Sequence, residues 1–371
     1  MRDPSMKHFI HQGVVQPNGS VDTSQSIRDL TQLKVLPSDD RCHLRIPKIG
    51  DFEWWYFDVI DPQGPVILKI VAHLGTDPMR RKCYPQLAIS AKTPSLSQAI
   101  TLPYSLDDFQ ASTDLCDVSL RDDFHVSVVS PNHDNIYQLF VDTEAFKANL
   151  KFIPDIEGWK PLGDEITIER KNKRSRFFWM IPLPKAKVVG EFSIGNSTFQ
   201  LGDGVGYHDH NYWKVDSPKK LFMDDVISKW YWGKLVAKDY TIIFMDTDLK
   251  SHSIKSLFLA KGNQILRSSN NFIKVIPDGF QKDIEIKTHY PSQITISSVE
   301  NNDPFEIILN GKEVTERKDL LEGVTPILKW LINVFVSRPA YYGILADATI
   351  NIEHKSIKGI GNYEMMFFRK N

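Results

Sequence analysis

The architecture of this chain is set by one run of residues, Phe52-Glu-Trp-Trp-Tyr-Phe-Asp-Val-Ile60, and by the segment directly after it. The turn formers Asp61-Pro-Gln-Gly64 lead into a second apolar run, Pro65-Val-Ile-Leu-Lys-Ile-Val-Ala-His-Leu74. Two runs of β-branched and aromatic residues separated by such a turn predict a β-hairpin. Alternation gives the first run two faces, one with Glu53, Trp55 and Phe57 and the other with Trp54, Tyr56 and Asp58.

Both faces of this strand are aromatic, which leaves two interpretations. The strand lies between two cores, or it forms a wall of an apolar pocket that contains Glu53. A carboxyl group in such a pocket is costly to bury unless it is paired or protonated, so we expect a raised pKa for Glu53. His73, on the second strand, is either a hydrogen-bonded structural histidine or part of the same wall.

Runs of the same kind recur at the spacing of an antiparallel sandwich or barrel. The further expected strands are 86–91, 124–130, 136–142, 148–152, 177–182, 187–194, 230–236, 241–248, 255–260, 272–276, 283–288, 294–298, 305–309, 341–352 and 359–369. Asn310-Gly311 predicts a tight hairpin turn, since both residues tolerate positive φ. One helix is expected, at 325–338, where Thr325 can cap it and Pro326 takes its first position.

The elements predict an all-β protein of two tandem antiparallel β barrels or sandwiches with one short helix in the C-terminal domain. Residues 1–45 have little periodicity and are expected to form an extended N-terminal arm. The N-terminal β domain is expected at 46–210 and the C-terminal β domain at 211–371.

The amino-acid composition argues against several classes of function. The 371 residues include 45 Lys and Arg against 46 Asp and Glu, so no basic excess favours nucleic acid as a partner. No apolar run approaches the roughly 20 residues that span a bilayer. Three cysteines without a CxxC spacing predict neither a disulfide framework nor a structural zinc site. The N-terminus lacks the apolar segment of a signal peptide, so we expect a cytoplasmic protein.

The second informative stretch is Gly202-Asp-Gly-Val-Gly-Tyr-His-Asp-His-Asn-Tyr-Trp213. If it is extended, His208 and His210 point one way and Tyr207, Asp209 and Asn211 the other. A His-x-His pair is half of a metal site, but no nearby glutamate or second pattern completes a ligand set, so we expect no metal.

Acid–base chemistry suits the same residues better. An Asp209 packed among aromatic rings could keep its proton near neutral pH and protonate an alkene, and the rings would stabilise the carbocation. The alternative is that Asp209 and His208 only hydrogen-bond a domain junction. No nucleophile elbow, P-loop or dinucleotide fingerprint is present, so acyl-enzyme, ATP and NAD chemistry are not expected.

Several motifs, in order, resemble the carotenoid 1,2-hydratase/AttH-like family over about residues 50–370. Glu53-Trp-Trp-Tyr-Phe-Asp58 resembles its EWWYFD motif, and Gly204-Val-Gly-Tyr-His-Asp-His-Asn211 its GxGYHDHNWG motif. Further matches are Phe178-Trp-Met-Ile-Pro182, Val189-Gly-Glu-Phe-Ser-Ile-Gly195, Trp230-Tyr-Trp-Gly233, Arg338-Pro-Ala-Tyr341 and Gly359-Ile-Gly-Asn-Tyr-Glu364. One departure is Tyr212-Trp213 where the family has Trp-Gly, which changes the backbone freedom after the motif.

The resemblance implies two lipocalin-like barrels with an apolar ligand cleft at their junction and no cofactor. It implies enzymes that add water to an isoprenoid double bond, with relatives that are pericyclases on polyenes. By this resemblance Asp209 is the proton donor, and Tyr207 and His208 position it. The expected substrate-binding residues are Glu53, Trp54, Trp55, Tyr56, His73, His210, Asn211, Trp213, Trp230 and Trp232.

We therefore predict a cofactor-independent hydratase or protonation-triggered cyclase that acts on a hydrophobic isoprenoid or polyene. One alternative is a pericyclase that pre-folds a polyene without protonating carbon. The other is a lipocalin-type carrier that binds an apolar ligand and catalyses nothing. The expected partner is a hydrophobic small molecule, which would also account for peripheral contact with a membrane.

Overall fold

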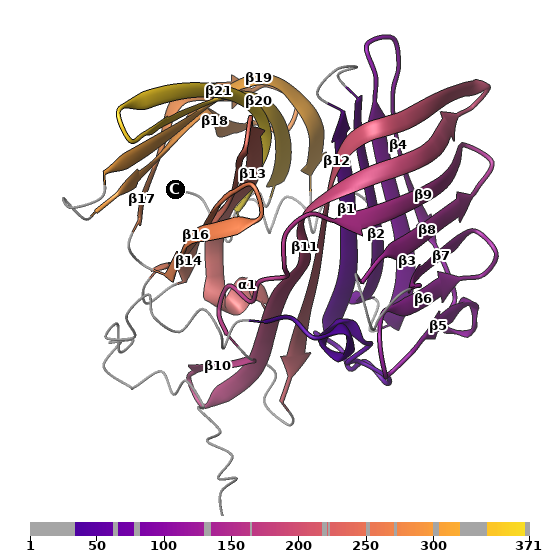
Figure 1. Cartoon of the computed structure of the whole chain (residues 1–371). Coiled ribbons are helices and arrows are strands. Elements are labelled where there is room, and N and C mark those ends of the chain that lie inside the picture. The colour runs from indigo at the N-terminus through magenta and orange to yellow at the C-terminus, as the bar shows by residue number, and fades with distance from the viewer. Residues whose placement is uncertain are drawn as a thin grey trace, which may run out of the picture.

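The structure is a computed structural model and describes residues 34–61, 66–77, 82–129, 135–163, 165–216, 221, 223–249, 253–270, 273–299, 304–319 and 340–367. Within these residues the chain forms two antiparallel sheets, each curled into a half-barrel (Figure 1). The first sheet is built from the indigo-to-pink part of the chain and the second from the orange-to-yellow part. The predicted all-β fold of two tandem lipocalin-like units is confirmed.

The first sheet begins at Phe52 and ends at Val215, so it includes both Glu53-Trp-Trp-Tyr-Phe-Asp58 and His208-Asp-His210. Its strands are β1 (Phe52–Asp61), β2 (Val66–Asp77), β3 (Lys82–Lys92), β4 (Ser97–Pro103), β5 (Phe109–Ala111), β6 (Asp117–Leu120), β7 (Phe124–Val128), β8 (Tyr137–Asp142), β9 (Phe146–Pro154), β10 (Ile166–Arg170), β11 (Lys173–Ile194) and β12 (Ser197–Val215). They follow the order β4-β3-β2-β1-β12-β11-β9-β8-β7-β6-β5, with β10 paired to β11. The motif-bearing strands β1 and β12 are therefore neighbours near the middle of the sheet.

The strands expected at 177–182 and 187–194 are two parts of the single strand β11. Its pairing with β12 shifts register between Met180 and Leu183, between Leu183 and Ala186, and between Val188 and Gly190. Such bulges bend a strand and increase its twist. They let one long β11–β12 hairpin curl along the whole length of the first sheet.

The second sheet is a meander with the order β16-β15-β14-β13-β21-β20-β19-β18-β17. Its strands are β13 (Ile227–Ala237), β14 (Tyr240–Leu249), β15 (Ser253–Lys261), β16 (Gln264–Asn270), β17 (Ile273–Asp283), β18 (Thr288–Ser298), β19 (Phe305–Asp319), β20 (Ala340–Ile352) and β21 (Lys355–Phe367). The last strand, β21, pairs with the first, β13, so the two ends of the domain's sequence meet.

The strand expected at 283–288 is wrong, because this segment is the turn between β17 and β18. Asp283 Oδ1 accepts hydrogen bonds from the backbone N–H groups of Glu285 and Ile286, which folds the chain back on itself. Lys287 completes the turn with a φ of 59°. A side-chain acceptor of this kind competes with the β ladder for the backbone donors.

The hairpin turn expected at Asn310-Gly311 is also wrong. The segment lies within β19, where Asn310 is opposite Asp347 and Gly311 opposite Ala346 of β20. The glycine is required by packing, since a Cβ at this position would lie 2.7 Å from the Tyr363 hydroxyl.

The chain passes from the first sheet to the second between Val215 and Ile227, through the short helix α1 (Met223–Val226). We propose this segment as the domain boundary. The helix expected at 325–338 lies outside the described residues. The expected N-terminal arm is described from residue 34, after which a 3₁₀ turn, η2 (Pro37–Asp40), carries the buried Asp40 and leads to the buried Cys42 and Leu44.

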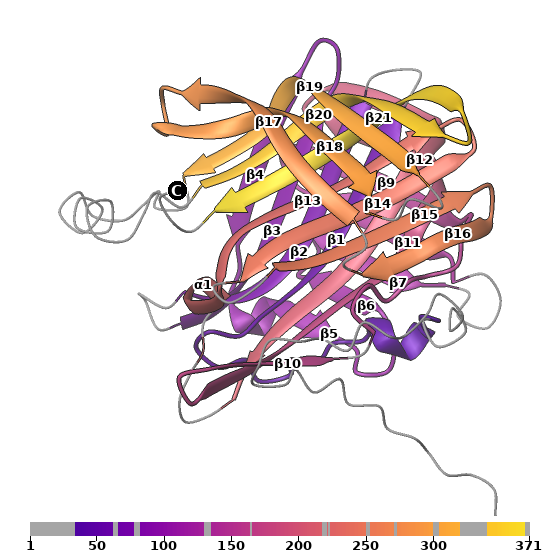
Figure 2. The same cartoon turned by 90° about the vertical axis from the view of Figure 1, so that its left-hand side faces the viewer.

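Each sheet has its own apolar core, and a third core lies between them. The third core joins Trp159, Trp179 and Tyr207 of the first unit to Trp232 and Phe258 of the second. In Figure 2 the strands of the second sheet cross in front of β11 and β12. Among the described residues, no helix is long and apolar enough to cross a membrane.

Candidate active site

The site is built on the paired central strands β1 and β12. Tyr56 lies opposite Asp209 in this pair, and Phe57 lies opposite His208. Successive side chains alternate across the pair, as the sequence predicts. We call the side toward the second sheet the inter-sheet face (Tyr56, Asp58, Tyr207, Asp209 and Asn211) and the side toward the first core the inner face (Glu53, Trp55, Phe57, His208 and His210).

Asp209 is the central group of the inter-sheet face and is 6% exposed. Its Oδ2 accepts hydrogen bonds from the Tyr207 hydroxyl (2.8 Å) and the Trp179 indole N–H (3.3 Å). Its Oδ1 accepts one from the Asn211 amide (3.0 Å). Burial raises the pKa of Asp209 to about 7, although the bonds from Tyr207 and Trp179 act in the opposite direction. The carboxyl group is held in one orientation and can carry a proton near neutral pH.

Aromatic rings surround this carboxyl group. The Tyr207 ring centroid lies 5.3 Å from that of Trp232 on β13 and 6.0 Å from that of Tyr56. Tyr56 and Trp232 are in turn 5.8 Å apart, nearly edge to face. Ring faces carry partial negative charge and attract cations. The arrangement can therefore stabilise a positive charge that forms next to Asp209.

Two buried ion pairs connect the sheets beside the aromatic group. Lys234 of β13 pairs with Asp58, and its ammonium also lies 5.1 Å from the Tyr207 ring centroid. Lys69 of β2 pairs with Glu364 of β21 at 2.6 Å. Burial raises the pKa of Asp58 and lowers that of Lys234, and each group partly offsets the shift of the other. The inter-sheet face thus combines apolar rings with fixed charges.

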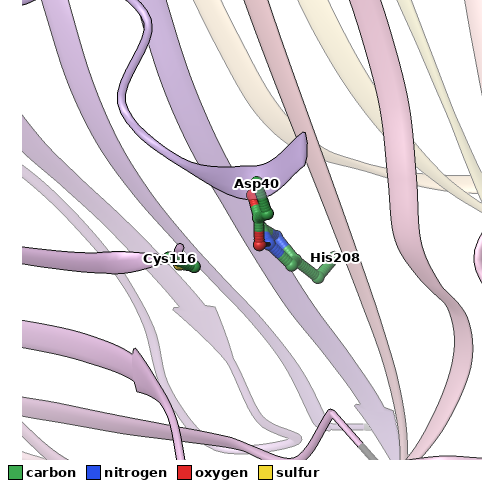
Figure 3. Close-up of side chains that lie close together, drawn as sticks. All are labelled: Asp40, Cys116 and His208. Carbon is green, nitrogen blue, oxygen red and sulfur yellow. Dashed lines mark hydrogen bonds and ion pairs between the residues drawn. The ribbon is translucent and has the colours of Figure 1, made fainter. Parts of the chain in front are cut away.

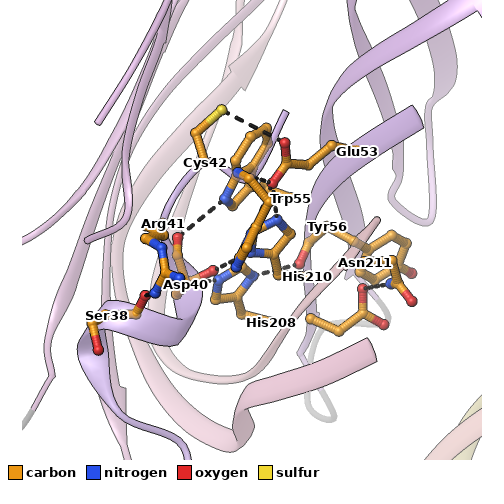
Figure 4. A network of polar contacts seen from close by, with 12 residues as sticks. Ser38, Asp40, Arg41, Cys42, Glu53, Trp55, Tyr56, His208, His210 and Asn211 are labelled. Carbon is orange, nitrogen blue, oxygen red and sulfur yellow. Dashed lines mark hydrogen bonds and ion pairs between the residues drawn. The ribbon is translucent and has the colours of Figure 1, made fainter. Parts of the chain in front are cut away.

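The inner face holds a separate polar network, shown in Figure 4. His210 lies between two carboxylates, with Nδ1 2.9 Å from Asp40 Oδ1 and Nε2 2.9 Å from Glu53 Oε1. His208 Nε2 is 2.9 Å from Asp40 Oδ2, and Figure 3 shows these two side chains together, with Cys116 on a neighbouring segment. His208 therefore points away from Asp209, so it cannot position that carboxyl group by direct contact.

The charge state of the inner face differs from the one expected for Glu53. Burial alone would raise the pKa of Glu53, but hydrogen bonds from His210 and His43 outweigh it and lower the pKa to about 2. Burial likewise opposes charge on His210, yet Asp40 and Glu53 raise its pKa to about 9. The predicted raised pKa of Glu53 is wrong because this carboxyl group is paired. Donor atoms that could hold a metal ion lie within 4.8 Å of one another in two groups, His43–Glu53–His210 and Asp40–Cys116–His208.

The remaining predicted binding residues divide between the faces. Trp55 is buried on the inner face and stacks on His210 at 4.6 Å. Trp54 stacks on Phe52 at 4.7 Å, and its centroid is 6.0 Å from that of His73, whose pKa burial lowers to about 4.

Two further predicted tryptophans lie beyond the ring group around Asp209. Trp213 is fully buried and donates to the Leu221 carbonyl, which anchors the chain after β12. Trp230 packs against the core between the sheets.

Several residues of these networks were not among the sequence predictions. Trp179 and Lys234 lie in or directly after motifs that were noted, at alternating positions that could have placed them on the inter-sheet face. Lys69 and Glu364 come together only through the packing of the two sheets. Asp40 and His43 come from a segment without periodicity, which gives no signal for their burial.

No protein-family model matches the chain, and no curated protein matches it. Solved structures do match its fold. CghA has 11% identity and a TM-score of 0.60, with 91% of this chain and 98% of that chain covered. A protein described as AttH, from Nitrosomonas europaea, has 12% identity and a TM-score of 0.59, with 91% and 97% covered. Kievitone hydratase from Nectria haematococca has 10% identity and a TM-score of 0.55, with 91% and 98% covered. The chain therefore has the two-sheet, lipocalin-like fold of the AttH-like proteins.

Proposed function

We propose that this chain is an enzyme that protonates a carbon–carbon double bond of an apolar small molecule, as a hydratase or a protonation-triggered cyclase. The observation that carries the proposal is the geometry of Asp209, a buried carboxyl group held by three donors and bordered by aromatic rings between the sheets. The similarity in fold to a kievitone hydratase supports the reaction class. The proposed substrate is an isoprenoid or polyene.

The proposed reaction begins with transfer of the Asp209 proton to one alkene carbon. A C–H bond forms as the π bond breaks, and the other carbon becomes a carbocation. The rings of Tyr207 and Trp232 would lie near this charge and attract it, and the new Asp209 carboxylate would lie next to it. In a hydratase, water then forms a C–O bond and returns a proton to Asp209. In a cyclase, a second double bond captures the cation and a neighbouring C–H bond releases the proton.

The test is turnover in heavy water with a panel of linear isoprenoids and polyenes, with product mass as the readout. The proposal expects deuterium on carbon, with or without the added mass of water. Asp209→Asn should lower the rate by about 10²- to 10⁴-fold, the usual contribution of a general acid. Asp283→Asn is the matched control, because it changes a buried carboxyl group in the second core, where Asp283 bonds to Tyr342.

Other outcomes would contradict the proposal in distinct ways. A product of unchanged mass without deuterium indicates a pericyclase. A ligand that is retained unchanged by wild type and by Asp209→Asn indicates a carrier. Full activity of Asp209→Asn would exclude Asp209 as the proton donor.

A further inference from the structure

We propose that the inner face of β12 is a binding site for a divalent transition-metal ion of the zinc class, with His43, Glu53 and His210 as ligands. The site lies on the opposite side of β12 from Asp209 and does not depend on the proposed alkene chemistry. It uses only His210 of the His-x-His pair, because His208 Nε2 contacts Asp40, and it adds a glutamate from β1 and a histidine from the segment before β1.

The first observation is the crowding of one carboxylate oxygen. Glu53 Oε1 lies 2.8 Å from the His43 backbone nitrogen, 3.1 Å from His43 Nδ1 and 2.9 Å from His210 Nε2. Two of these three nitrogens are imidazole nitrogens, which are zinc ligands when they carry no proton. A cation between the two rings and Glu53 would leave the backbone bond to Oε1 in place.

The second observation is the spacing of the donor atoms. Ligand atoms bound to one tetrahedral zinc ion at 2.0–2.1 Å lie about 3.4 Å apart. The two ring nitrogens already lie 2.9 and 3.1 Å from Glu53 Oε1, and all three donor atoms lie within 4.8 Å of one another. The donor atoms are therefore already near the spacing of one zinc site, and an ion would replace the ring protons, which leave to solvent.

The third observation is the support behind each ligand. Asp40 Oδ1 lies 2.9 Å from His210 Nδ1, so that Nε2 is directed toward the site and becomes a ligand once its proton leaves, the carboxylate–histidine–metal arrangement of many metalloproteins. The Leu44 backbone N–H holds Glu53 Oε2 at 2.9 Å. The His43 ring stacks on Tyr212 at 4.4 Å. The donors are oriented before an ion arrives.

The fourth observation is access. A pocket of about 290 Å³ is lined by Cys42, His43 and Tyr212, and by three basic residues against one acidic residue (Arg41, Arg45 and Lys214 against Glu165). The His43 side chain is 14% exposed, whereas those of Glu53 and His210 are fully buried. An ion would keep an open coordination position toward this pocket, where the basic residues favour water, hydroxide or a small anion as the fourth ligand. The group Asp40–Cys116–His208, in contrast, is buried at all three residues.

The test is titration of the full chain with ZnCl₂ by calorimetry after treatment with a chelator. We expect one zinc ion per chain. His43→Gln should weaken binding at least about 100-fold, because even partners behind the ligands contribute 10- to 100-fold. His125→Gln is the matched control, since His125 is an exposed histidine of the first sheet that pairs with Asp117. It should bind zinc like wild type.

A second variant tests the carboxylate behind His210, and the unfolding temperature separates metal binding from folding. Asp40→Asn keeps the size of the side chain and should weaken zinc binding by about 10- to 100-fold. Zinc should raise the unfolding temperature of wild type and of His125→Gln, but not that of His43→Gln, by mass action. Absence of stoichiometric binding, or equal affinity of wild type and His43→Gln, would overturn the proposal. Equal loss of affinity in His125→Gln would overturn it too, because the binding would then belong to other histidines of the chain.

Discussion

Tyr207 and Tyr212 lie on the same strand and donate to different carboxyl groups on opposite sides of it. Tyr207 bonds to Asp209 at 2.8 Å, and Tyr212 bonds to Glu165 at 2.7 Å. The same change of hydroxyl to hydrogen at each position therefore tests the two faces separately. This makes the pair a sharper probe of Asp209 than any substitution of the aspartate itself.

We expect Tyr207→Phe to slow the proposed reaction by about two- to tenfold. The lost hydrogen bond stabilises the carboxylate that remains after proton donation, and one such bond contributes about 0.5–1.5 kcal/mol. Tyr212→Phe should leave the rate within twofold of wild type (roughly 0.4 kcal/mol). The measurement is the initial rate in the heavy-water assay. Equal effects of the two variants would contradict a direct role for Tyr207.

For individual residues, the sequence predicted part of the site. Alternation alone put Asp209, Tyr207 and Asn211 on one face of β12 and the histidines on the other. It could not show that His208 faces Asp40, because Asp40 is in a segment whose burial depends on tertiary contacts. For the same reason the sequence could not predict the lowered pKa of Glu53, because nothing in the sequence pattern indicates that His43 is its partner.

Glycines of β12 show how the strand fits the first core. A Cβ at Gly206 would lie 2.4 Å from Val188 Cγ2 and 2.7 Å from Phe152 Cδ1. At Gly202, in the same strand, a Cβ would meet nothing within 4 Å. Gly202 and Gly206 therefore have different structural roles, although both belong to the glycine-rich stretch just before His208.

We expect Gly206→Ala to lower the free energy of unfolding by about 1–3 kcal/mol, the usual cost of overpacking. Gly202→Ala should change it by less than about 0.5 kcal/mol, as surface substitutions usually do. Urea unfolding followed by tryptophan fluorescence measures both. If Gly206→Ala were as stable as Gly202→Ala, the close packing of β12 against Phe152 and Val188 would be contradicted.

Strand positions were predicted well where β-branched and aromatic residues alternate, as in β1, β2 and β20. Two expectations were wrong, one for a local reason and one for a long-range reason. The strand predicted at 283–288 fails because Asp283 uses its side chain to form a turn. The turn predicted at Asn310-Gly311 fails because the glycine makes room for Tyr363, a contact between residues far apart in sequence.

For the whole molecule, the two sheets are joined by ion pairs of very different exposure. Lys69 is 5% exposed and pairs with Glu364 at 2.6 Å, with Glu316 at 3.9 Å. Lys92 of β3 also reaches the second sheet, where it pairs with Glu313, but these side chains are 24% and 45% exposed. The two lysines are thus a matched pair for measuring what buried charge contributes to docking.

We expect Lys69→Met to destabilise the protein by about 3–5 kcal/mol, because it leaves the buried Glu364 carboxylate without its cation. Lys92→Met should cost about 0–1 kcal/mol, the range for exposed pairs. Chemical unfolding near neutral pH measures both. Similar small effects would show that the sheets are held by apolar packing alone.

The Lys69→Met effect should also depend on pH. Burial opposes charge on Glu316, but Lys69 and Lys318 outweigh it and hold the pKa of Glu316 below its usual value. A lowered carboxyl pKa contributes stability above the unfolded-state value of about 4.3, and this contribution is lost as the pH falls through the folded-state value. The difference between wild type and Lys69→Met should therefore shrink below about pH 4. A difference that grows on acidification would contradict this assignment.

The long strand β12 has a further consequence for how this protein can change. Asp209 and the two imidazoles occupy alternate positions, so each substitution affects one side of the wall between the half-barrels. An insertion or deletion of one residue upstream in the strand would act differently, because it reverses the orientation of every side chain after it. The aspartate would then face the first core and the imidazoles the second sheet. The length of this segment is therefore constrained independently of its composition.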